Sequence, residues 1–383
     1  MWLYRILVIL VLARWIERSA GLWLGWRRLP SLRDIPPADA GSLPRLSIVV
    51  PALNEESTAG EAMKTLLALD YPDLEIVAVD DRSTDSTGEI LDRLAARDSR
   101  LKVIHVKDLP DGWLGKSHAM HVGSREATGS WILFTDADVH FEPTALRRAV
   151  GYAEAEGVDH LVATPDVVAR DFWEIVFLSF FWVIFAFHWE PRKASDPGSR
   201  AYVGVGAFNL VRADAYRRAG GHAAMPLEVI DDVMLGKLLK LSGARQACIP
   251  GGGLVKVRWI EGLGGAVRGL TKNMFAGLRF NPLMAVLSSA VLFTGAILPA
   301  LGLFVGPWDT RLLCAAIFAC MAWATRTGVM IPRLSPLYGL TFPAGAAILI
   351  YIIFRSMLLT YVRGGIVWRG THYPLSRLRR GLV

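Results

Sequence analysis

Three long apolar stretches near the end of the chain constrain its fold more than any other feature. They are Pro282–Gly306, Leu312–Ile331 and Leu340–Tyr361. Each is long enough for a helix to cross the roughly 30 Å apolar layer of a bilayer. The second contains Arg326 and the third Arg355, and an arginine is costly inside a membrane. We therefore expect a C-terminal transmembrane region at 276–362, in which one of these two stretches does not cross, and a basic tail at 363–383.

The beginning of the chain is also apolar. Trp2 to Trp26 carries only four charged side chains, and no convincing cleavage site of small residues follows it. We expect residues 1–29 to be an anchor, either a single tilted helix across the membrane or a helix in its interface. The proline-rich residues 30–44 are typical of a linker. A folded domain is predicted between the linker and the membrane region, at 45–275.

The charge of the chain is unevenly distributed. The whole chain has 42 Lys and Arg against 35 Asp and Glu, and 52% of its residues are apolar. Residues 1–33 hold six basic side chains and one acidic, and residues 263–383 hold twelve and one. The middle is consequently acidic, which argues against a nucleic-acid partner, while the basic ends suit anionic lipid headgroups. The three cysteines show neither metal-ligand spacing nor a paired framework, which suits a reducing, cytoplasmic environment.

Short β-branched runs alternate with helix-like segments in the folded domain. The runs are Leu46–Pro51, Glu75–Asp80, Leu101–Val106 and Trp131–Asp136. The segments between them are Ser57–Leu69, Ser83–Arg97 and Ser117–Thr128, each with a serine near the start. This alternation predicts βαβ units and a parallel sheet in an α/β fold. Ligands of such sheets bind at the carboxyl ends of the strands.

Acidic side chains gather at those strand ends. Asp80 and Asp81 close the second run, and Asp136 and Asp138 close the fourth. Carboxylates at one sheet edge repel one another, so they need a cation. Oxygen ligands one residue apart suit Mg²⁺ or Mn²⁺, which bind through one or two carboxylates together with ligand phosphates. A solvated turn is the alternative interpretation of such a D-x-D pattern.

The ordered set of motifs resembles family-2 glycosyltransferases, the nucleotide-diphospho-sugar transferases of GT-A type, over residues 44–275. The resemblance implies a Rossmann-like GT-A domain with membrane segments at both ends. It also implies that Val50–Glu56 and one of Asp80 or Asp81 hold the nucleotide. Within these segments the expected substrate-binding residues are Pro51, Asn54, Glu55, Asp80, Asp81 and Ser83.

The same resemblance assigns residues to the sugar-diphosphate end of the donor, where the reaction takes place. Asp136 and Asp138 match the D-x-D that binds the metal and the sugar-diphosphate. Asp231 matches the usual first acid of a later pair, and Asp232 is the expected catalytic base. A helix N-terminal cap is the alternative interpretation of this pair.

Other segments narrow the branch of the family. Trp113–Ala119 resembles the glycine-lysine segment of membrane-attached enzymes that glycosylate ceramide, carotenoid or hopanoid lipids. Its Lys116 either neutralises the diphosphate or is an ordinary surface lysine. Gly204–Asn209 and Gly220–His222 resemble acceptor-side motifs. Arg258 and Trp259 match the end of a Q/R-x-x-R-W element and are expected to bind substrate, but its first position is Val255, unlike a processive polysaccharide synthase.

We therefore expect a metal-dependent, inverting glycosyltransferase that takes a nucleotide-diphospho-sugar, with UDP-sugar as the expected donor. The acceptor would be a lipid. The expected location is the inner or plasma membrane, multi-pass, with a cytoplasmic catalytic domain. Transfer to a polyprenyl phosphate and polysaccharide synthesis remain alternatives. A non-catalytic membrane protein that binds a nucleotide-sugar is an alternative of another class.

One apolar run interrupts the folded domain. Phe172–Trp189 is long enough to span, yet a single crossing would put Asp136 and Asp232 on opposite sides of the membrane. We expect the run to rest in the membrane interface, with its aromatic rings, Phe180 and Trp182 among them, at the headgroups. A core helix under the sheet is the alternative.

Overall fold

The structure, a computed structural model, describes residues 2–326 and 330–382, and it divides into two compact units. Residues 327–329 of the expected stretch Leu312–Ile331 lie outside the described part. Unit 1 comprises Met1–Leu29, Ala169–Trp189 and Trp259–Arg379, and unit 2 comprises Pro30–Val168, Glu190–Arg258 and Arg380–Val383.

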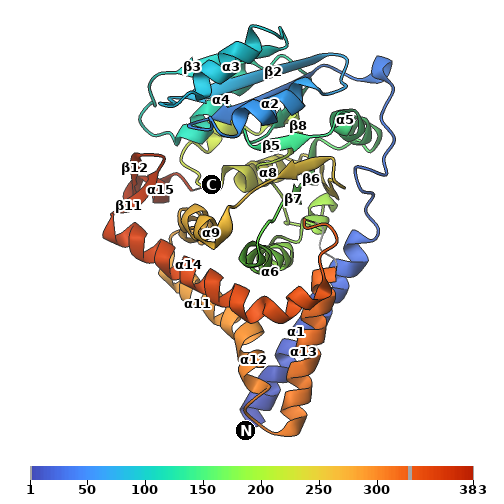
Figure 1. Ribbon diagram of the computed structural model, residues 1–383, viewed down its shortest axis with the longest axis vertical. Helices are drawn as coiled ribbons and strands as arrows, with labels where there is room; N and C mark the ends of the chain where they lie inside the picture. The colour runs from blue at the N-terminus through green and yellow to red at the C-terminus, as the bar shows by residue number, and fades with distance from the viewer. Residues whose placement is uncertain (1, 327–329, 383) are drawn as a thin grey trace. The chain divides into compact units, whose positions relative to one another are not determined.

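Unit 2 is built on a seven-stranded sheet (Figure 1). In spatial order its strands are β3 (Leu101–Val106), β2 (Leu74–Asp81), β1 (Leu46–Ala52), β4 (Trp131–Phe134), β8 (Asn209–Arg212), β6 (His160–Thr164) and β9 (Gln246–Pro250). The first four match the runs expected from the sequence within two residues at each end. They pair in parallel, as predicted.

The sheet is mixed, because β8 runs antiparallel to both β4 and β6. This strand was not expected from the sequence, because its place between β4 and β6 is set by long-range pairing. A second sheet has three strands, β5 (Val139–Phe141), β10 (Val255–Val257) and β7 (Asp166–Val167), in that order. Its strand β5 starts directly after Asp138.

The helices of unit 2 include the three expected from the sequence. They are α2 (Ala59–Leu67), α3 (Thr87–Ala95), α4 (Gly115–Glu126), α5 (Ala145–Ala155), α7 (Ala213–Arg218) and α8 (Asp231–Leu241), with short turns η1 (Ala40–Ser42), η2 (Pro191–Ser195) and η3 (Gly221–Ala224). Helix α4 packs on β1 and β2 so closely that a Cβ on Gly123 would meet Val79 at 3.1 Å and overlap Val49. This contact fixes the N-terminus of α4 at the carboxyl edge of the sheet.

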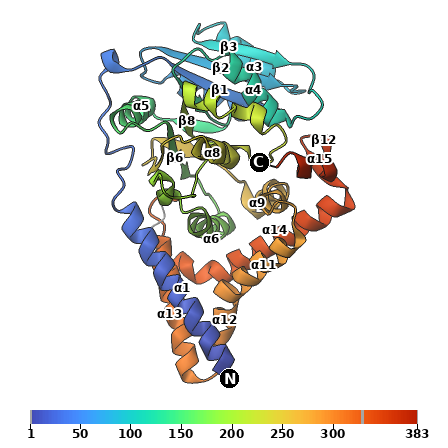
Figure 2. The ribbon, with the colours of Figure 1, turned by 180° about the vertical axis from the view of Figure 1, so that it is seen from behind.

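Unit 1 is largely helical (Figure 2). Its elements are α1 (Trp2–Trp26), α6 (Phe172–Trp189), α9 (Gly262–Thr271), α10 (Met274–Gly277), α11 (Pro282–Leu292), the π-helix η4 (Phe293–Ile297), α12 (Leu298–Gly302), α13 (Trp308–Arg326), η5 (Pro336–Thr341), α14 (Phe342–Val362), β11 (Gly365–Trp368), β12 (Thr371–Pro374) and α15 (Leu375–Arg380). Helices α1 and α13 run side by side in both views. Arg5 of α1 pairs with Asp309 of α13 at 3.0 Å.

The surface of unit 1 is apolar. Among the described residues, every exposed large apolar side chain except Val168 and Leu241 belongs to this unit. Three helical segments are long and apolar enough to cross a membrane: Phe172–Ser195, Pro282–Gly302 and Pro336–Val362. Exposed apolar surface on this scale is typical of contact with lipid. Helix α1 is not among the three, so its role as an anchor stays a prediction.

Helix α6 corrects one detail of the interface hypothesis. Phe180 and Trp182 are buried by other helices of unit 1, with Phe180 stacked edge-on against Phe342. They are not available to lipid headgroups. The exposed aromatic rings of this helix are Phe172 and Trp173 at its N-terminal end. The alternative of a core helix under the sheet is not supported either, because α6 groups with the helices of unit 1.

Candidate functional site

The loops after β1, β2 and β4 meet at one edge of the sheet in unit 2. The parallel register pairs Ala52 with Asp80, and Val49 with Phe134, so these strands end side by side. The segments that carry the predicted site residues therefore leave the sheet together. The expected placement at the carboxyl edge is confirmed.

The first two loops are tied to each other by hydrogen bonds. Asn54 has a left-handed backbone with φ of 54°, and its N–H donates to Ser83 Oγ at 3.1 Å. Its side-chain oxygen accepts from the Thr84 N–H at 2.8 Å. Pro51, which lacks an N–H, lies in β1 opposite Val79. These hydrogen bonds join the two loops that carry the predicted nucleotide-binding residues.

Asp80 and Asp81 are both buried, and each has a partner that the sequence did not indicate. Asp80 accepts from the Ser83 N–H and lies 2.9 Å from a ring nitrogen of His105. The guanidinium of Arg82 contacts both oxygens of Asp81, at 2.8 and 3.0 Å. Strand β3, not a sequence motif, brings His105 to this place.

The metal-binding candidate Asp138 is largely buried and lies within the electrostatic influence of two other carboxylates. Burial raises the pKa of Asp138 to about 7, and the negative charges of Asp136 and Glu55 act in the same direction. A carboxyl with so high a pKa lacks a sufficient positive neighbour. The group therefore suits a cation.

Lys116 supplies part of that positive charge. It follows the first residue of α4, and its Nζ lies 2.7 Å from Asp136 Oδ1 and 3.6 Å from Asp231 Oδ2. Burial alone would lower the pKa of Lys116, but Asp136, Asp231 and Asp232 outweigh it and raise the pKa. Lys116 is not an ordinary surface lysine, because its ammonium lies among three carboxylates.

Asp232 is the second residue of α8, and two backbone N–H groups donate to its carboxylate. Gly206 donates to its Oδ2 at 2.8 Å, and Val233 donates to its Oδ1 at 2.9 Å. Burial raises its pKa, while Lys116 opposes this shift. The helix-cap interpretation is wrong, because Ile230 is the N-cap residue of α8 and no side chain caps this helix end. Each oxygen of Asp232 keeps a second lone pair for another donor.

Gly206 lies close to both the metal-binding candidate Asp136 and the candidate base Asp232. A Cβ on Gly206 would lie 2.6 Å from Asp136 Oδ2 and 3.4 Å from Asp232 Oδ2. Its neighbour Gly204 lies against the backbone of Asp232, whose carbonyl oxygen a Cβ would overlap. The segment Gly204–Asn209 thus owes its glycines to close packing on α8 at the site.

The protein alone does not complete a metal site. Within residues 2–326 and 330–382, no three His, Cys, Asp or Glu side chains are grouped to hold a metal ion. Asp136 and Asp138 offer oxygen ligands, which suits a hard cation that takes its other ligands from phosphate and water. The binding of Mg²⁺ or Mn²⁺ at Asp136 and Asp138 stays a prediction.

The two residues of the R-W element belong to different units, Arg258 to unit 2 and Trp259 to unit 1. Arg258 follows β10, whose Val257 pairs with Val139, so the antiparallel register puts Arg258 next to Asp138 along the strands. Trp259 belongs to unit 1, where its ring contacts Phe181 at 5.1 Å. A substrate role for Arg258 and for Trp259 stays a prediction.

The segment Gly220–His222 is part of the core. His222 is buried, and its Nδ1 lies 2.8 Å from the Tyr216 hydroxyl. Gly221, with φ of 54°, lies so close to the Tyr216 ring that a Cβ would overlap it. An acceptor-side role for His222 would need it to reach solvent, so we assign the segment to packing.

Known proteins that are similar to this chain include glycosyltransferases. Residues 47–220 match the family described as Glycosyl transferase family 2. The chain is 24% identical over 340 residues to 4,4'-diaponeurosporenoate glycosyltransferase of Staphylococcus aureus, covering 87% of this chain and 89% of that protein. Among solved structures, it is similar to a mannosyltransferase of Pyrobaculum calidifontis in complex with GDP-Man and Mn²⁺. That likeness covers 91% of this chain and 99% of the other, with a TM-score of 0.57 and 21% identity, and it confirms the GT-A-like α/β fold.

Proposed function

Because residues 47–220 match the family described as Glycosyl transferase family 2, we propose that this protein moves a sugar from a nucleotide-diphospho-sugar to an amphiphilic acceptor at a membrane. The observation that carries the proposal is the convergence of Asp136, Lys116 and Asp232 beside Gly206. Glycosyl transfer needs a positive charge to stabilise the negative charge that develops on the leaving diphosphate. It also needs a base to take the proton of the acceptor hydroxyl. This group of residues offers both within one site.

Asp136, Asp138 and Lys116 are the residues proposed to stabilise the negative charge of the leaving diphosphate. The two carboxylates would hold Mg²⁺ or Mn²⁺, which supplies Lewis-acid compensation of the departing charge when bound. Lys116 is near enough to exchange a carboxylate partner for a phosphate oxygen, because its Nζ already lies at the head of the D-x-D. The solved mannosyltransferase was obtained with Mn²⁺, which supports a divalent ion.

Asp232 is the proposed base. Its two backbone hydrogen bonds fix the carboxylate while leaving lone pairs for the acceptor hydroxyl. A raised pKa makes it a better proton acceptor than an ordinary aspartate. Direct attack of the deprotonating hydroxyl on the anomeric carbon inverts that centre. Asp231, beside it, holds Lys116 in position.

The nucleotide is proposed to bind at the paired loops. Pro51, Asn54 and Glu55 come from the first loop, and Asp80, Asp81 and Ser83 from the second. Their mutual hydrogen bonds make a preformed site that needs little ordering on binding. We propose a UDP-sugar as donor, and a direct comparison with GDP-sugars tests this choice.

The acceptor is proposed to be a lipid. The Staphylococcus aureus relative is named for diaponeurosporenoate, and unit 1 exposes most of the large apolar side chains of the described chain. We place the catalytic unit on the cytoplasmic side of the cell membrane, where arginines such as Arg27 and Arg28 follow the first apolar segment. Arg258 and Trp259 are proposed to contact the substrates.

The test is metal-dependent donor binding. Calorimetry with UDP- and GDP-sugars, with and without Mn²⁺, should give an affinity that depends on Mn²⁺ in the full chain and is lost in Asp138→Ala. Asp214→Asn, on the exposed surface of unit 2 where Asp214 pairs with Arg218, is the control and should bind as the unmodified chain does. Equal metal-dependent affinity in Asp138→Ala would remove the D-x-D from the account.

A further inference from the structure

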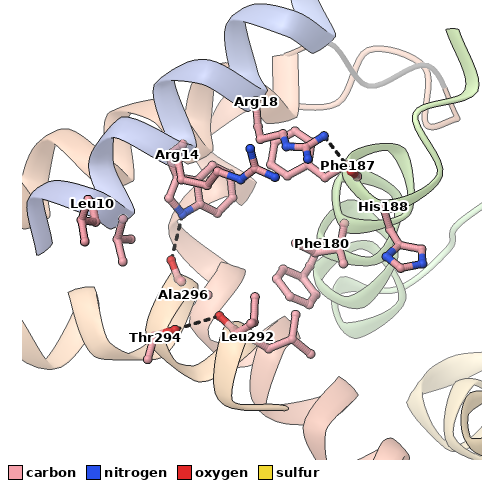
Figure 3. A pocket seen from close by; sticks show the side chains of 14 residues that line it. Leu10, Arg14, Arg18, Phe180, Phe187, His188, Leu292, Thr294 and Ala296 are labelled. Atoms are coloured by element: carbon pink, nitrogen blue, oxygen red, sulfur yellow. Dashed lines mark hydrogen bonds between the residues drawn. The ribbon is translucent and has the colours of Figure 1, made fainter. Parts of the chain in front are cut away.

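Unit 1 contains a cavity of about 480 Å³, lined by α1, α6 and the residues around η4 (Figure 3). Two polar side chains of its lining donate to backbone carbonyls: the Trp15 indole N–H to Gly295 at 2.8 Å, and Arg18 to Phe187 at 3.1 Å. These side chains already have partners within the protein, so the cavity by itself points to no ligand. A histidine of unit 2 has a closer bearing on the donor.

His105 of β3 lies between two carboxylates. The parallel register pairs it with Asp80 of β2, and its Nδ1 lies 2.9 Å from Asp80 Oδ2. On the other side of the ring, Nε2 lies 3.0 Å from Asp92 Oδ1 of α3. An ionised carboxylate accepts hydrogen bonds and donates none, so both contacts are hydrogen bonds only when both ring nitrogens carry a proton. The arrangement is therefore that of an imidazolium between two carboxylates.

The two carboxylates depend on this histidine to different degrees. The side chain of Asp80 is 10% exposed, whereas that of Asp92 is 57% exposed. Asp80 Oδ1 also accepts from the Ser83 N–H at 3.2 Å, in the second nucleotide loop. Water can replace the imidazole at Asp92 but reaches Asp80 poorly. A neutral His105 would therefore keep its one proton on Nδ1, toward Asp80, and release Asp92.

The first turn of α3 packs closely on this group. A Cβ on Gly88 would lie 2.8 Å from Asp80 Oδ2 and 3.4 Å from His105 Cε1. The preceding residue, Thr87, accepts from the Glu55 N–H at 2.8 Å through its hydroxyl. Glu55 belongs to the first nucleotide loop. The helix that carries the second partner of His105 is thus also bonded to that loop.

The partners of His105 favour its charged form. Its hydrogen bonds with Asp80 and Asp92 raise the pKa of His105 above the ordinary value near 6.5, while burial opposes this shift. Among the described residues, the charged groups that act on the ring are Asp80 of β2 and Asp92 of α3. The imidazolium therefore persists to a higher pH than in an isolated histidine.

We propose that His105 is a positioning residue for the donor: as an imidazolium it fixes the Asp80 carboxylate and offsets its negative charge beside the anionic nucleotide. The inference rests on the proposed binding of a nucleotide-diphospho-sugar at the paired loops. Asp80 would contact the nucleotide, and His105 acts through Asp80. When His105 loses its proton, Asp80 meets the anionic donor without compensation, and α3 loses a bond to β3. Donor affinity should fall, whereas kcat at saturating donor should not change.

The experiment measures the donor Kd of the full chain by calorimetry with UDP-sugar and Mn²⁺ between pH 6 and pH 9. His105→Gln keeps an N–H donor for Asp80 but has no charge. At pH 6 its Kd should be roughly threefold to fivefold higher than that of the unmodified chain, as for a partly exposed charge pair. This ratio of Kd values should shrink as the pH rises, and it cancels the titration of Asp138. His372→Gln, at an exposed histidine of unit 1, is the matched control and should bind as the unmodified chain does.

Asp92→Asn tests the same bridge from the surface without touching Asp80. It removes one of the two carboxylates that hold the proton, so donor affinity should fall at a lower pH than in the unmodified chain. Carbon-13 resonances of labelled histidine follow the titration of His105 directly, and His105→Gln assigns its signal. The pKa of His105 in the donor-free chain should lie above 6.5 and should be lowered by Asp92→Asn.

The possible failures are distinguishable. A ratio of Kd values that is constant with pH, a fall in kcat with an unchanged KM for the donor in His105→Gln, or an unchanged His105 titration in Asp92→Asn would each overturn the positioning role alone. Absence of donor binding by the unmodified chain at every pH would overturn the proposed function, and this inference with it.

Discussion

At the scale of single residues, Lys116 ties the site together, because its ammonium lies among Asp136, Asp231 and Asp232. The sequence showed only a lysine after a glycine at the start of a helix. Its two possible roles could not be separated without knowing where α4 begins in space. The close contact of Gly123 with Val49 and Val79, which positions α4, has no recognisable sequence signature.

Replacing Lys116 tests this arrangement. In Lys116→Met the carboxylates of Asp136 and Asp231 lose their counter-ion, so the donor-free protein should bind Mn²⁺ roughly tenfold or more tightly. Turnover should fall, because the diphosphate loses a cation. Manganese titration followed by electron paramagnetic resonance measures the first effect. Lys64→Met, which removes an exposed lysine paired with Glu61, is the control. Weaker manganese binding in Lys116→Met would contradict the assignment.

The buried histidines give the stability of unit 2 a pH dependence. Burial lowers the pKa of His222 to about 3 and that of His160 to about 4, below the ordinary value near 6.5. The unfolded chain therefore takes up protons first as the pH falls. The contribution of these groups is full above about pH 6.5 and is lost below it, by up to about 1.4 kcal/mol per histidine per pH unit.

Urea unfolding followed by tryptophan fluorescence at pH 7 and pH 5 measures this loss. His222→Gln should be less stable than the unmodified chain at pH 7, because it loses the partner of Tyr216, yet its stability should fall less between the two pH values. The difference between the two slopes isolates His222 from Asp138, whose raised pKa acts in the opposite direction. Identical slopes would mean that folding does not lower the pKa of His222.

At the scale of elements, the sequence predicted the first half of the sheet well and the second half poorly. The runs that became β1 to β4 are apolar, and each of the first three is followed by a helix with clear composition. Strand β8 is short and antiparallel, and its place between β4 and β6 is set by long-range pairing. The site residues were likewise predicted in part from the sequence and in part not. Asp136 and Asp138 were found from a strand end, whereas Gly206 acquires its role through contact with α8.

Gly204 and Gly206 both lie close to Asp232 of α8, but an added methyl group at each position would meet different atoms. In Gly206→Ala the new methyl group would meet the end of the Asp136 side chain, so metal-dependent donor affinity should fall with little loss of stability. In Gly204→Ala it would overlap backbone of Asp232, and the free energy of unfolding should fall by about 1–3 kcal/mol. Gly41→Ala, into open space, should change neither.

Thermal unfolding and donor calorimetry on these three variants distinguish the two effects. A Gly206→Ala variant with unaltered donor affinity would mean that Asp136 does not need its present position. A Gly204→Ala variant as stable as Gly41→Ala would mean that α8 can move away from the loop.

At the scale of the whole molecule, the chain combines a GT-A-like unit with a helical unit whose surface is apolar. The apolar stretches predicted the helices of unit 1, because length and composition suffice for that. They could not predict which aromatic rings of α6 face outward, since burial of Phe180 depends on Phe342, far along the chain. The exposed pair Phe172 and Trp173 now replaces it in the interface hypothesis.

The most direct test of the central claim is transfer of a labelled sugar from a nucleotide-sugar into the lipid fraction of membranes that contain this protein. The unmodified chain with Mn²⁺ should transfer label, and Asp232→Asn should lose about 10²- to 10⁴-fold in kcat while its donor affinity is retained. Asp214→Asn should transfer normally. Near-normal transfer by Asp232→Asn would contradict the account, and so would donor binding without transfer by the unmodified chain across lipid extracts.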